Sequence, residues 1–130
     1  MKVTVTAPDA PAAIGPYSHA VMHNGLLLTS GQIGADPVTG QMAGPDAASQ
    51  TRQCMRNLDA VLRAAGAGWN DVLKATVYLA DMADFTAMNE EYKSWFTSGY
   101  PARCCVATAG MALGARVEIE LLAAVSHCNS

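Results

Sequence analysis

Two stretches of the chain repeat apolar residues every three or four positions, the spacing that places them on one face of an α-helix. The first covers residues 45–68. Asp46 can accept a hydrogen bond from the first turn as an N-cap, and Gly66 can end the helix. We expect the apolar stripe to pack in the core; it consists of Cys54, Met55, Leu58, Val61, Leu62 and Ala65.

The second helical stretch covers residues 84–99. Asp84 is its predicted N-cap, and Gly99 followed by Pro101 is expected to end it. We interpret its apolar side as a surface that packs in the core, not as a cofactor-binding surface. That side is made up of Phe85, Met88, Tyr92, Trp95 and Phe96.

Elsewhere apolar and polar residues alternate with the period of two that is typical of half-buried β-strands. Asn24-Gly25 favours a tight hairpin, because both residues tolerate the positive φ values of such a turn. Residues 36–40 (DPVTG) predict a second turn. We expect strands within residues 2–7, on both sides of the hairpin in 18–33, and within 71–81, 102–108 and 115–125.

This order of strands and helices predicts an α+β fold, with residues 1–130 forming a single domain in which two helices cover one face of a mixed β-sheet. The other face of the sheet must then be buried by something else. For a chain of 130 residues, further copies of the same chain are the expected cover.

Composition narrows the class of protein. Hydrophobic residues make up 51% of the chain and charged residues 15%, with a formal net charge of −3. Eight Lys and Arg residues spread along the chain form no basic stripe, so nucleic acid is not expected as a partner. We find no apolar run of the ~18 residues that a membrane span needs and no signal-peptide core, and therefore expect a cytoplasmic protein.

Cysteine and histidine positions predict neither a metal site nor a disulfide framework, because no ligand-like spacing occurs among them. On a strand, Cys104 and Cys105 point to opposite faces and cannot bond to each other. We predict Cys104 to be a small core residue. Cys105 is expected to line a pocket beside Arg103, not to act as a nucleophile, since no histidine base is near it. The full set is Cys54, Cys104, Cys105, Cys128, His19, His23 and His127.

Glu118 and Glu120 share one face of the last predicted strand, roughly 7 Å apart by the ~3.3 Å rise per residue. If both were shielded from water, repulsion and desolvation would raise at least one pKa and allow proton exchange near neutral pH. On a solvated face both would be ordinary surface carboxylates. Arg103 likewise has two interpretations: an ion pair with one of these glutamates, or a bidentate contact to a carboxylate ligand.

Three further residues are weaker candidates. Tyr17 follows a Gly-Pro turn, where an aromatic residue can cap the core. Gly31 interrupts an apolar strand, which indicates a bulge or a close approach of backbone to a ligand, and its N–H could contact an anion. Asn89 lies one step off the apolar stripe of the second helix, where a solvated asparagine is the default interpretation.

Several segments together resemble the Rid family, also called YjgF or L-PSP proteins, and its RidA branch of enamine/imine deaminases. They follow one another in order over nearly the whole chain, and the PAR-x-x-V…VEIE combination is the most specific part. They include APAAIGPYSHAV, LLLTSGQIG, VLKATVYLADMADFTAMNEEYKSWF and YPARCCVATAGMALGARVEIELLA.

The resemblance implies a chorismate-mutase-like domain that assembles as a homotrimer with three clefts between subunits. It implies that Arg103 binds the substrate carboxylate, assisted by backbone groups at Gly31 and Cys105. Tyr17 and Asn89 would line the cleft, with Tyr17 contributed by the neighbouring subunit.

By the same resemblance, Glu118 would activate water for hydrolysis of a 2-enamine or 2-imino acid, such as 2-aminoacrylate or 2-iminobutanoate, to the 2-oxo acid and ammonia. No metal or organic cofactor is implied. Three alternatives stay open: an endoribonuclease or translation inhibitor of the L-PSP type, a catabolic Rid deaminase acting on aminomuconate or aminoacrylate, and a non-catalytic trimer that binds small carboxylates.

The sequence departs from the family pattern at several positions. Cys104 replaces a serine or another small residue, which should be harmless. His19 stands where glutamine is common and could alter the pocket rim or its pH response. Residues 111–115 lack the usual Leu-Pro, so we expect a more pliable loop and an effect on the preferred substrate side chain.

Overall fold

The computed structural model describes residues 1–125, and His127 and Cys128 lie outside this range. One mixed sheet runs in the order β1-β2-β3-β7-β5-β6, and the short strand β4 pairs with β7. β5 and β6 are parallel, whereas the other pairs are antiparallel. The strands are β1 (Val3–Val5), β2 (Ala20–His23), β3 (Leu26–Thr29), β4 (Gln32–Ile33), β5 (Val72–Leu79), β6 (Ala102–Ala107) and β7 (Val117–Ala124).

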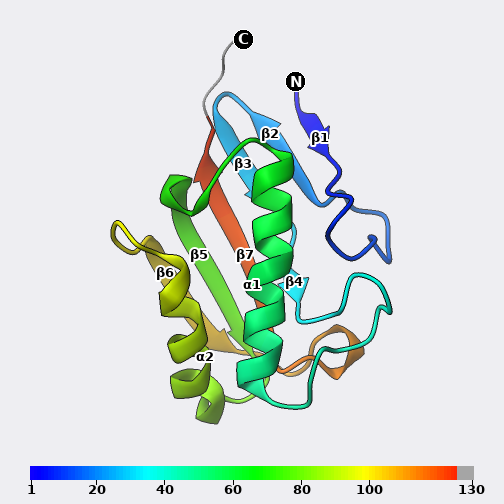
Figure 1. Cartoon of the computed structure of the whole chain (residues 1–130), viewed down its shortest axis with the longest axis vertical. Coiled ribbons are helices and arrows are strands. Elements are labelled where there is room, and N and C mark those ends of the chain that lie inside the picture. Colours follow the sequence, from blue (N-terminus) through cyan, green and yellow to red (C-terminus); the bar gives the residue numbers. More distant parts are fainter. Residues whose placement is uncertain (126–130) are drawn as a thin grey trace.

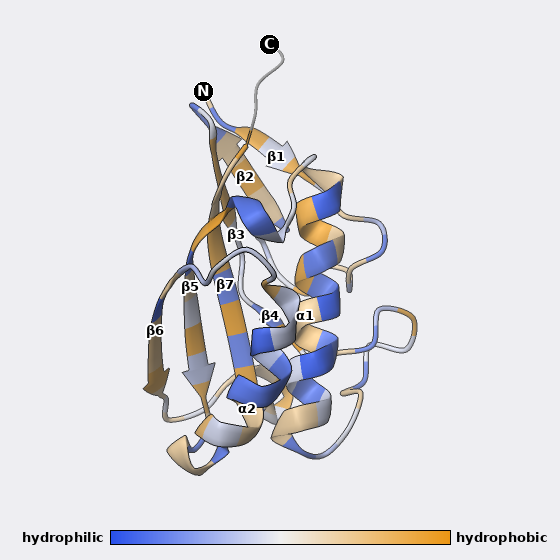
Figure 2. Ribbon diagram, turned by 60° about the vertical axis from the view of Figure 1, so that its left-hand side comes forward, coloured by the Kyte–Doolittle hydropathy of each residue, from blue (hydrophilic) through white to orange (hydrophobic). Residues whose placement is uncertain are grey.

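Both helices lie on the same face of this sheet (Figures 1 and 2). Along β7 every second residue is buried, which is the alternation that Figure 2 shows by hydropathy. Val117, Ile119 and Ala123 are fully buried on the helix side. Their neighbours, which include Glu118 and Glu120, point to the face that carries no helix and are only half-buried. The predicted α+β architecture is confirmed.

The hairpin between β2 and β3 turns at Asn24 and Gly25, with φ values of 51° and 78°. Both lie in the left-handed region that the sequence predicted for a two-residue turn. The second predicted turn is also present: Gly40 donates its N–H to the carbonyl of Asp36 at 2.8 Å. The Asp36 side chain accepts two further N–H groups of the same turn.

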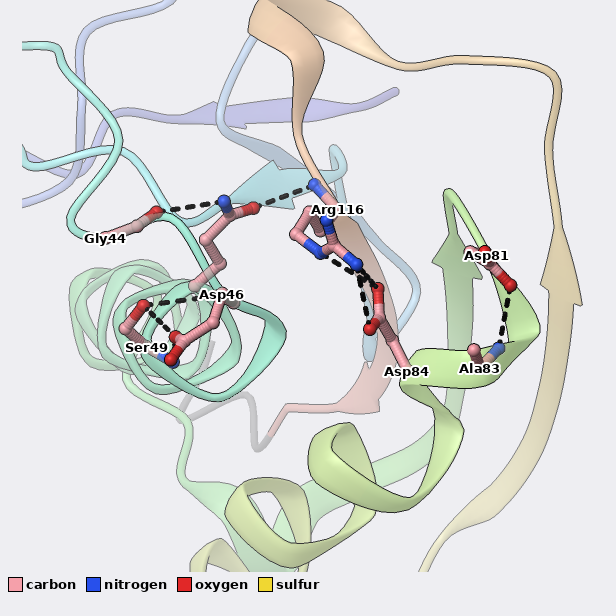
Figure 3. Close-up of polar contacts among 8 residues, drawn as sticks. Gly44, Asp46, Ser49, Asp81, Ala83, Asp84 and Arg116 are labelled. Atoms are coloured by element: carbon pink, nitrogen blue, oxygen red, sulfur yellow. Dashed lines mark hydrogen bonds and ion pairs between the residues drawn. The ribbon is translucent and has the colours of Figure 1, made fainter.

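Helix α1 (Ala47–Ala64) begins at the predicted N-cap, since Asp46 accepts the Ser49 N–H at 2.8 Å. It ends just before Gly66, which has a φ of 76°. Two of its buried polar side chains, Gln50 and Asn57, bind the neighbouring backbone. Gln50 donates to the carbonyl of Gly44 and accepts the N–H of Arg116, as Figure 3 shows.

Helix α2 (Phe85–Tyr92) is flanked by single 3-10 turns at Met82–Asp84 and Lys93–Trp95. Asp84 occupies the predicted N-cap position but forms no capping hydrogen bond. Instead its carboxylate binds the Arg116 guanidinium at 3.0 and 3.1 Å, and Asp81 caps the preceding turn through Ala83 (Figure 3). The nearby arginine competes successfully for this carboxylate.

None of the helices within residues 1–125 is long and apolar enough to span a membrane.

Candidate active site

Glu118 lies on the helix-free face of β7, directly opposite Tyr78 of β5 and Ile33 of β4. Partial burial raises the pKa of its carboxyl group, and the charge of Glu120 on the same strand raises it further. Of the two interpretations that the sequence left open, the structure therefore favours the interacting pair over two ordinary surface carboxylates. Glu120 is also held in place, because the Tyr78 hydroxyl donates to its carboxylate at 3.1 Å.

Gly31 separates β3 from β4 and lies against Glu118. A β-carbon at this position would be 2.9 Å from the carboxyl carbon of Glu118 and 3.0 Å from its Cγ. Contacts this short are not tolerated between real side chains and their neighbours. Glycine at position 31 therefore lets the backbone approach the Glu118 carboxylate. Its predicted contact with a ligand stays a prediction.

A cavity of about 320 Å³ opens beside this carboxylate, and Tyr17, Gly31 and Glu118 all line it. Tyr17 is half-exposed, and its hydroxyl accepts the Ile14 N–H at 3.3 Å. Three of the predicted site residues thus meet in one place. Most other side chains around this cavity, which we call the Glu118 cavity, are apolar.

Arg103 lies elsewhere, on β6 and on the opposite face of the sheet. It aligns with Ala75 of β5, whereas Glu118 aligns with Tyr78 three positions further on. Positions 75 and 78 of one strand point to opposite faces. The structure thus shows neither an Arg103–Glu118 nor an Arg103–Glu120 ion pair, and the interpretation of Arg103 as their partner is wrong.

The partners of Arg103 come from α2. Its Nη1 donates to Oδ1 of Asn89 at 2.7 Å. Its guanidinium carbon lies 4.9 Å from the centroid of the Tyr92 ring and 5.5 Å from that of Phe85, within the range of cation–π attraction. Asn89 is therefore not a solvated residue: it orients the predicted anchor.

No carboxylate in residues 1–125 lies within ion-pair distance of Arg103, whereas Arg52, Arg63, Lys93 and Arg116 are each paired with one. A second cavity of similar size is lined by Asn89, Tyr92 and Arg103. We call it the Arg103 cavity. Burial raises the pKa of Tyr92 to about 12, against the lowering effect of Arg103. Lys93 also lines this cavity but pairs with Glu90. Arg103 is therefore the cation in its lining that has no carboxylate partner within residues 1–125.

Sequence reasoning missed Phe85 and Tyr92 as members of the site. Both follow helical spacing around Asn89, at four residues before it and three after it, so the signal was present. We interpreted this spacing as a sign of core packing. That interpretation is also correct for Tyr92, which is 4% exposed. A residue can bury its edge in the core and offer its ring face to a cation.

The cysteines divide between the two faces of β6 as predicted, but one assignment is wrong. Cys104 is exposed on the helix-free face and is not a core residue. The reason is that no element of residues 1–125 covers that face. Cys105 is half-buried against the core on the Arg103 side, and burial raises the pKa of its thiol. It is not among the residues that line the cavity beside Arg103, so its predicted place in that pocket stays a prediction.

His19 is buried and structural. Its Nδ1 accepts the Ala7 N–H at 2.8 Å, and its Nε2 donates to the Pro11 carbonyl at 2.7 Å. It therefore fixes the segment that leads to Tyr17. Among residues 1–125, no three His, Cys, Asp or Glu side chains are grouped closely enough to hold a metal ion.

Residues 7–125 match the family described as endoribonuclease L-PSP. The chain belongs to this family. A Homo sapiens protein named 2-iminobutanoate/2-iminopropanoate deaminase is 43% identical over 119 residues, which is 92% of this chain and 87% of that protein. The Capra hircus protein of the same name is 44% identical with the same coverage.

Solved structures agree with this assignment. A structure of E. coli TdcF with bound serine has a TM-score of 0.91 and 37% identity, covering 95% of this chain and 99% of that one. A putative endoribonuclease L-PSP from Entamoeba histolytica has a TM-score of 0.93 and 42% identity, covering 96% and 100%.

Proposed function

We propose that this chain is an imine deaminase that hydrolyses 2-imino acids and their enamine forms, such as 2-iminobutanoate and 2-aminoacrylate, to 2-oxo acids and ammonia. The names of the Homo sapiens and Capra hircus relatives support this reaction. The observation that carries it is Arg103, a cation oriented by Asn89 and two aromatic rings and lacking a carboxylate partner in residues 1–125.

Arg103 is proposed to bind the α-carboxylate of the substrate. A planar guanidinium can contact both carboxylate oxygens and fix their orientation, which contributes about 1.5–3 kcal/mol. The bound serine in the related E. coli structure is a ligand with an α-carboxylate. Holding the imine in this way supplies proximity for the attack of water.

Glu118 is proposed to act as the general base. It takes a proton from water while the oxygen attacks the imine carbon, and the electron pair of the C=N bond moves to nitrogen. Glu118 returns this proton to nitrogen, which gives the carbinolamine. The hydroxyl proton then moves to the amino group, the C=O bond forms as the C–N bond breaks, and ammonia and the 2-oxo acid are released. Such a base adds ~10²–10⁴-fold. The half-buried position and raised pKa of Glu118 suit this exchange.

These two roles require two copies of the chain, because Arg103 and Glu118 lie on opposite faces of one sheet. We propose a homotrimer in which the Arg103 cavity of one subunit meets the Glu118 cavity of the next. Two features support it: β6 pairs only with β5 within residues 1–125, and the helix-free face exposes Leu26, Leu28 and Val106. Apolar residues gathered on one face indicate a protein contact.

The decisive experiment is a coupled assay. Threonine dehydratase generates 2-iminobutanoate, and formation of 2-oxobutanoate is followed with and without the protein. We expect a faster rate with the wild-type chain and a kcat/KM lowered about 10- to 100-fold in Arg103→Ala, from the lost charge-assisted contact. Arg56→Ala is the matched control, since Arg56 lines neither of the two cavities. An unaccelerated rate with wild-type protein would contradict the proposal.

RNA is the comparison substrate, because the family description names an endoribonuclease. Arg52, Arg63, Lys93 and Arg116 each pair with a carboxylate. Half of the eight Lys and Arg residues are therefore already neutralised, which reduces the positive charge that could attract a phosphate backbone. Purified protein that cleaves RNA, and loses this activity in Arg103→Ala, would favour the ribonuclease over the deaminase.

A further inference from the structure

Three exposed apolar side chains stand around the Glu118 cavity: Ile14, Val38 and Leu113, with 71%, 91% and 61% of their surface exposed. They come from three loops far apart in sequence. Figure 1 shows these loops on the side of the molecule next to β4. Single exposed apolar residues are ordinary, but three that converge on one cavity indicate a binding surface. We call them the apolar rim.

The loop of Leu113 is held in an unusual conformation. Leu113 has a φ of 56° and Gly114 a φ of 65°. A bulky side chain in this left-handed region is disfavoured, and residues held there tend to occur at functional sites. The residues that follow the loop keep it in place. Ala115 is buried, and the backbone N–H of Arg116 donates a hydrogen bond to the Gln50 side chain.

The other two loops are also fixed locally. The Asp36 carboxylate accepts the backbone N–H groups of Val38 and Thr39 at 2.8 and 3.0 Å. The Ile14 N–H donates to the Tyr17 hydroxyl, and His19 holds Pro11. The rim is therefore built from braced loops, so its shape is largely set before a ligand arrives.

The charge of the cavity limits what can bind there. Tyr17 and Glu118 are the ionisable side chains that line it, and neither Lys, Arg nor His does. An anionic side chain placed on the rim would face Glu118, and in the proposed trimer the Arg103 of the next subunit is already occupied by the α-carboxylate of the substrate. An apolar group would instead cover Ile14, Val38 and Leu113 and gain from leaving water.

We infer that the apolar rim binds the substrate's side chain and makes the enzyme selective for 2-imino acids with neutral, branched or extended apolar side chains over those with acidic ones. This inference rests on the proposed deaminase function and names the substrate class of that site. A cavity of about 320 Å³ has room for more than the methyl or ethyl group of the smallest imines.

The test compares kcat/KM for two imines made in situ by an amino-acid oxidase with catalase: 2-imino-4-methylpentanoate from leucine and 2-iminopropanoate from alanine. Leu113→Ala and Val38→Ala should each lower the ratio of the first to the second about 5- to 10-fold, as expected for a lost side-chain contact. Leu73→Ala and Val3→Ala are matched controls, because both residues are exposed but lie outside the Glu118 cavity.

A charge-gain variant gives the reverse test. Val38→Lys places a cation on the rim and should raise turnover of the glutamate-derived 2-imino acid several-fold relative to 2-iminopropanoate. Calorimetric binding of the products 4-methyl-2-oxopentanoate and pyruvate reports the same preference without turnover. The wild-type chain should bind the larger product more tightly, and Leu113→Ala should reduce that difference.

The outcomes of these experiments distinguish failure of the rim inference from failure of the proposed deaminase function. If the wild-type chain accelerates hydrolysis of both imines and the rim variants leave the ratio unchanged, the rim inference is overturned while the deaminase stands. If these variants change the assembly mass and not the ratio, the rim is a subunit contact and the inference also fails. If wild-type protein hydrolyses neither imine and binds both products equally, the proposed function and the inference fail together.

Discussion

Arg103 and Glu118 project from opposite faces of one sheet, at positions that align with Ala75 and Tyr78 of β5. Each has its own cavity and its own supporting residues. A single substrate cannot contact both side chains of one subunit across a packed sheet. Any reaction that uses the two residues together therefore takes place between two copies of the chain.

Gly31→Ala should impair catalysis more than folding. The added methyl group would meet the Glu118 carboxylate and move it away from its present position. We expect kcat to fall about 10- to 100-fold, as for other small displacements of a reacting group. Gly68→Ala is the matched control, because a β-carbon there has no neighbour within 4 Å. Equal kinetics of the two variants in the dehydratase-coupled assay would argue against the general-base role.

Asn89→Asp should weaken the binding of the substrate carboxylate by Arg103. A carboxylate in place of the Asn89 amide oxygen, which lies 2.7 Å from Arg103, would neutralise the guanidinium and compete with the substrate. We expect KM to rise about 10- to 100-fold with little change in thermal stability. Asn89→Ala removes the same hydrogen bond without adding charge, and its KM should rise less. A larger effect of the alanine variant would mean that orientation, not charge, decides binding.

Tyr92 separates the role of the ring from that of the hydroxyl. Its hydroxyl is buried and has no hydrogen-bond partner in residues 1–125. Tyr92→Phe should therefore leave KM unchanged and raise the free energy of unfolding by up to about 1 kcal/mol. Tyr92→Leu removes the ring below Arg103 and should raise KM through the lost cation–π contact, worth about 1–2 kcal/mol. Chemical denaturation and steady-state kinetics on both variants check this.

The raised pKa of Glu118 makes both activity and stability depend on pH. The base works only when ionised, so kcat/KM should fall as pH drops through this pKa. Glu120→Gln removes the neighbouring charge that helps to raise it. The acid limb of the pH–rate profile should therefore move to lower pH in this variant. If the acid limb stays at the same pH in this variant, the group that titrates is not Glu118.

The raised pKa of Glu118 also determines in which direction folding stability changes with pH. Because the folded state holds the Glu118 proton more tightly than the unfolded state, folding stability falls as pH rises through the interval between the two pKa values. Glu118→Gln should accordingly be more stable than wild type above this interval. The difference should shrink at lower pH, where wild-type Glu118 is protonated in both states. Urea titrations at several pH values measure it.

Local signals in the sequence predicted most of the fold. The Asn24-Gly25 turn, the Asp46 cap and the strand alternation around Glu118 each depend on neighbouring residues, and the structure confirms all three. The roles of Asp84 and Cys104 depend on what packs against them. Asp84 binds Arg116 from a distant strand, and Cys104 lies on a face that residues 1–125 leave uncovered.

The candidate site was harder to predict than the fold. Alternation within one strand fixes which residues share its faces, but it does not give the register in which separate strands pair. That register with β5 places Arg103 and Glu118 on opposite faces of the sheet. The aromatic partners Phe85 and Tyr92 were hidden for a related reason, because their helical spacing is also that of core residues.

Mixing two impaired variants tests the two-subunit site most directly. Arg103→Ala and Glu118→Gln are purified separately, unfolded together in equal amounts and refolded, and imine hydrolysis is measured. If Arg103 of one subunit serves Glu118 of the next in a closed ring, random assembly restores both residues in about a quarter of the sites. We therefore predict recovery of about a quarter of wild-type activity, against at most about a tenth for either variant refolded alone. A mixture as inactive as its components would contradict the account.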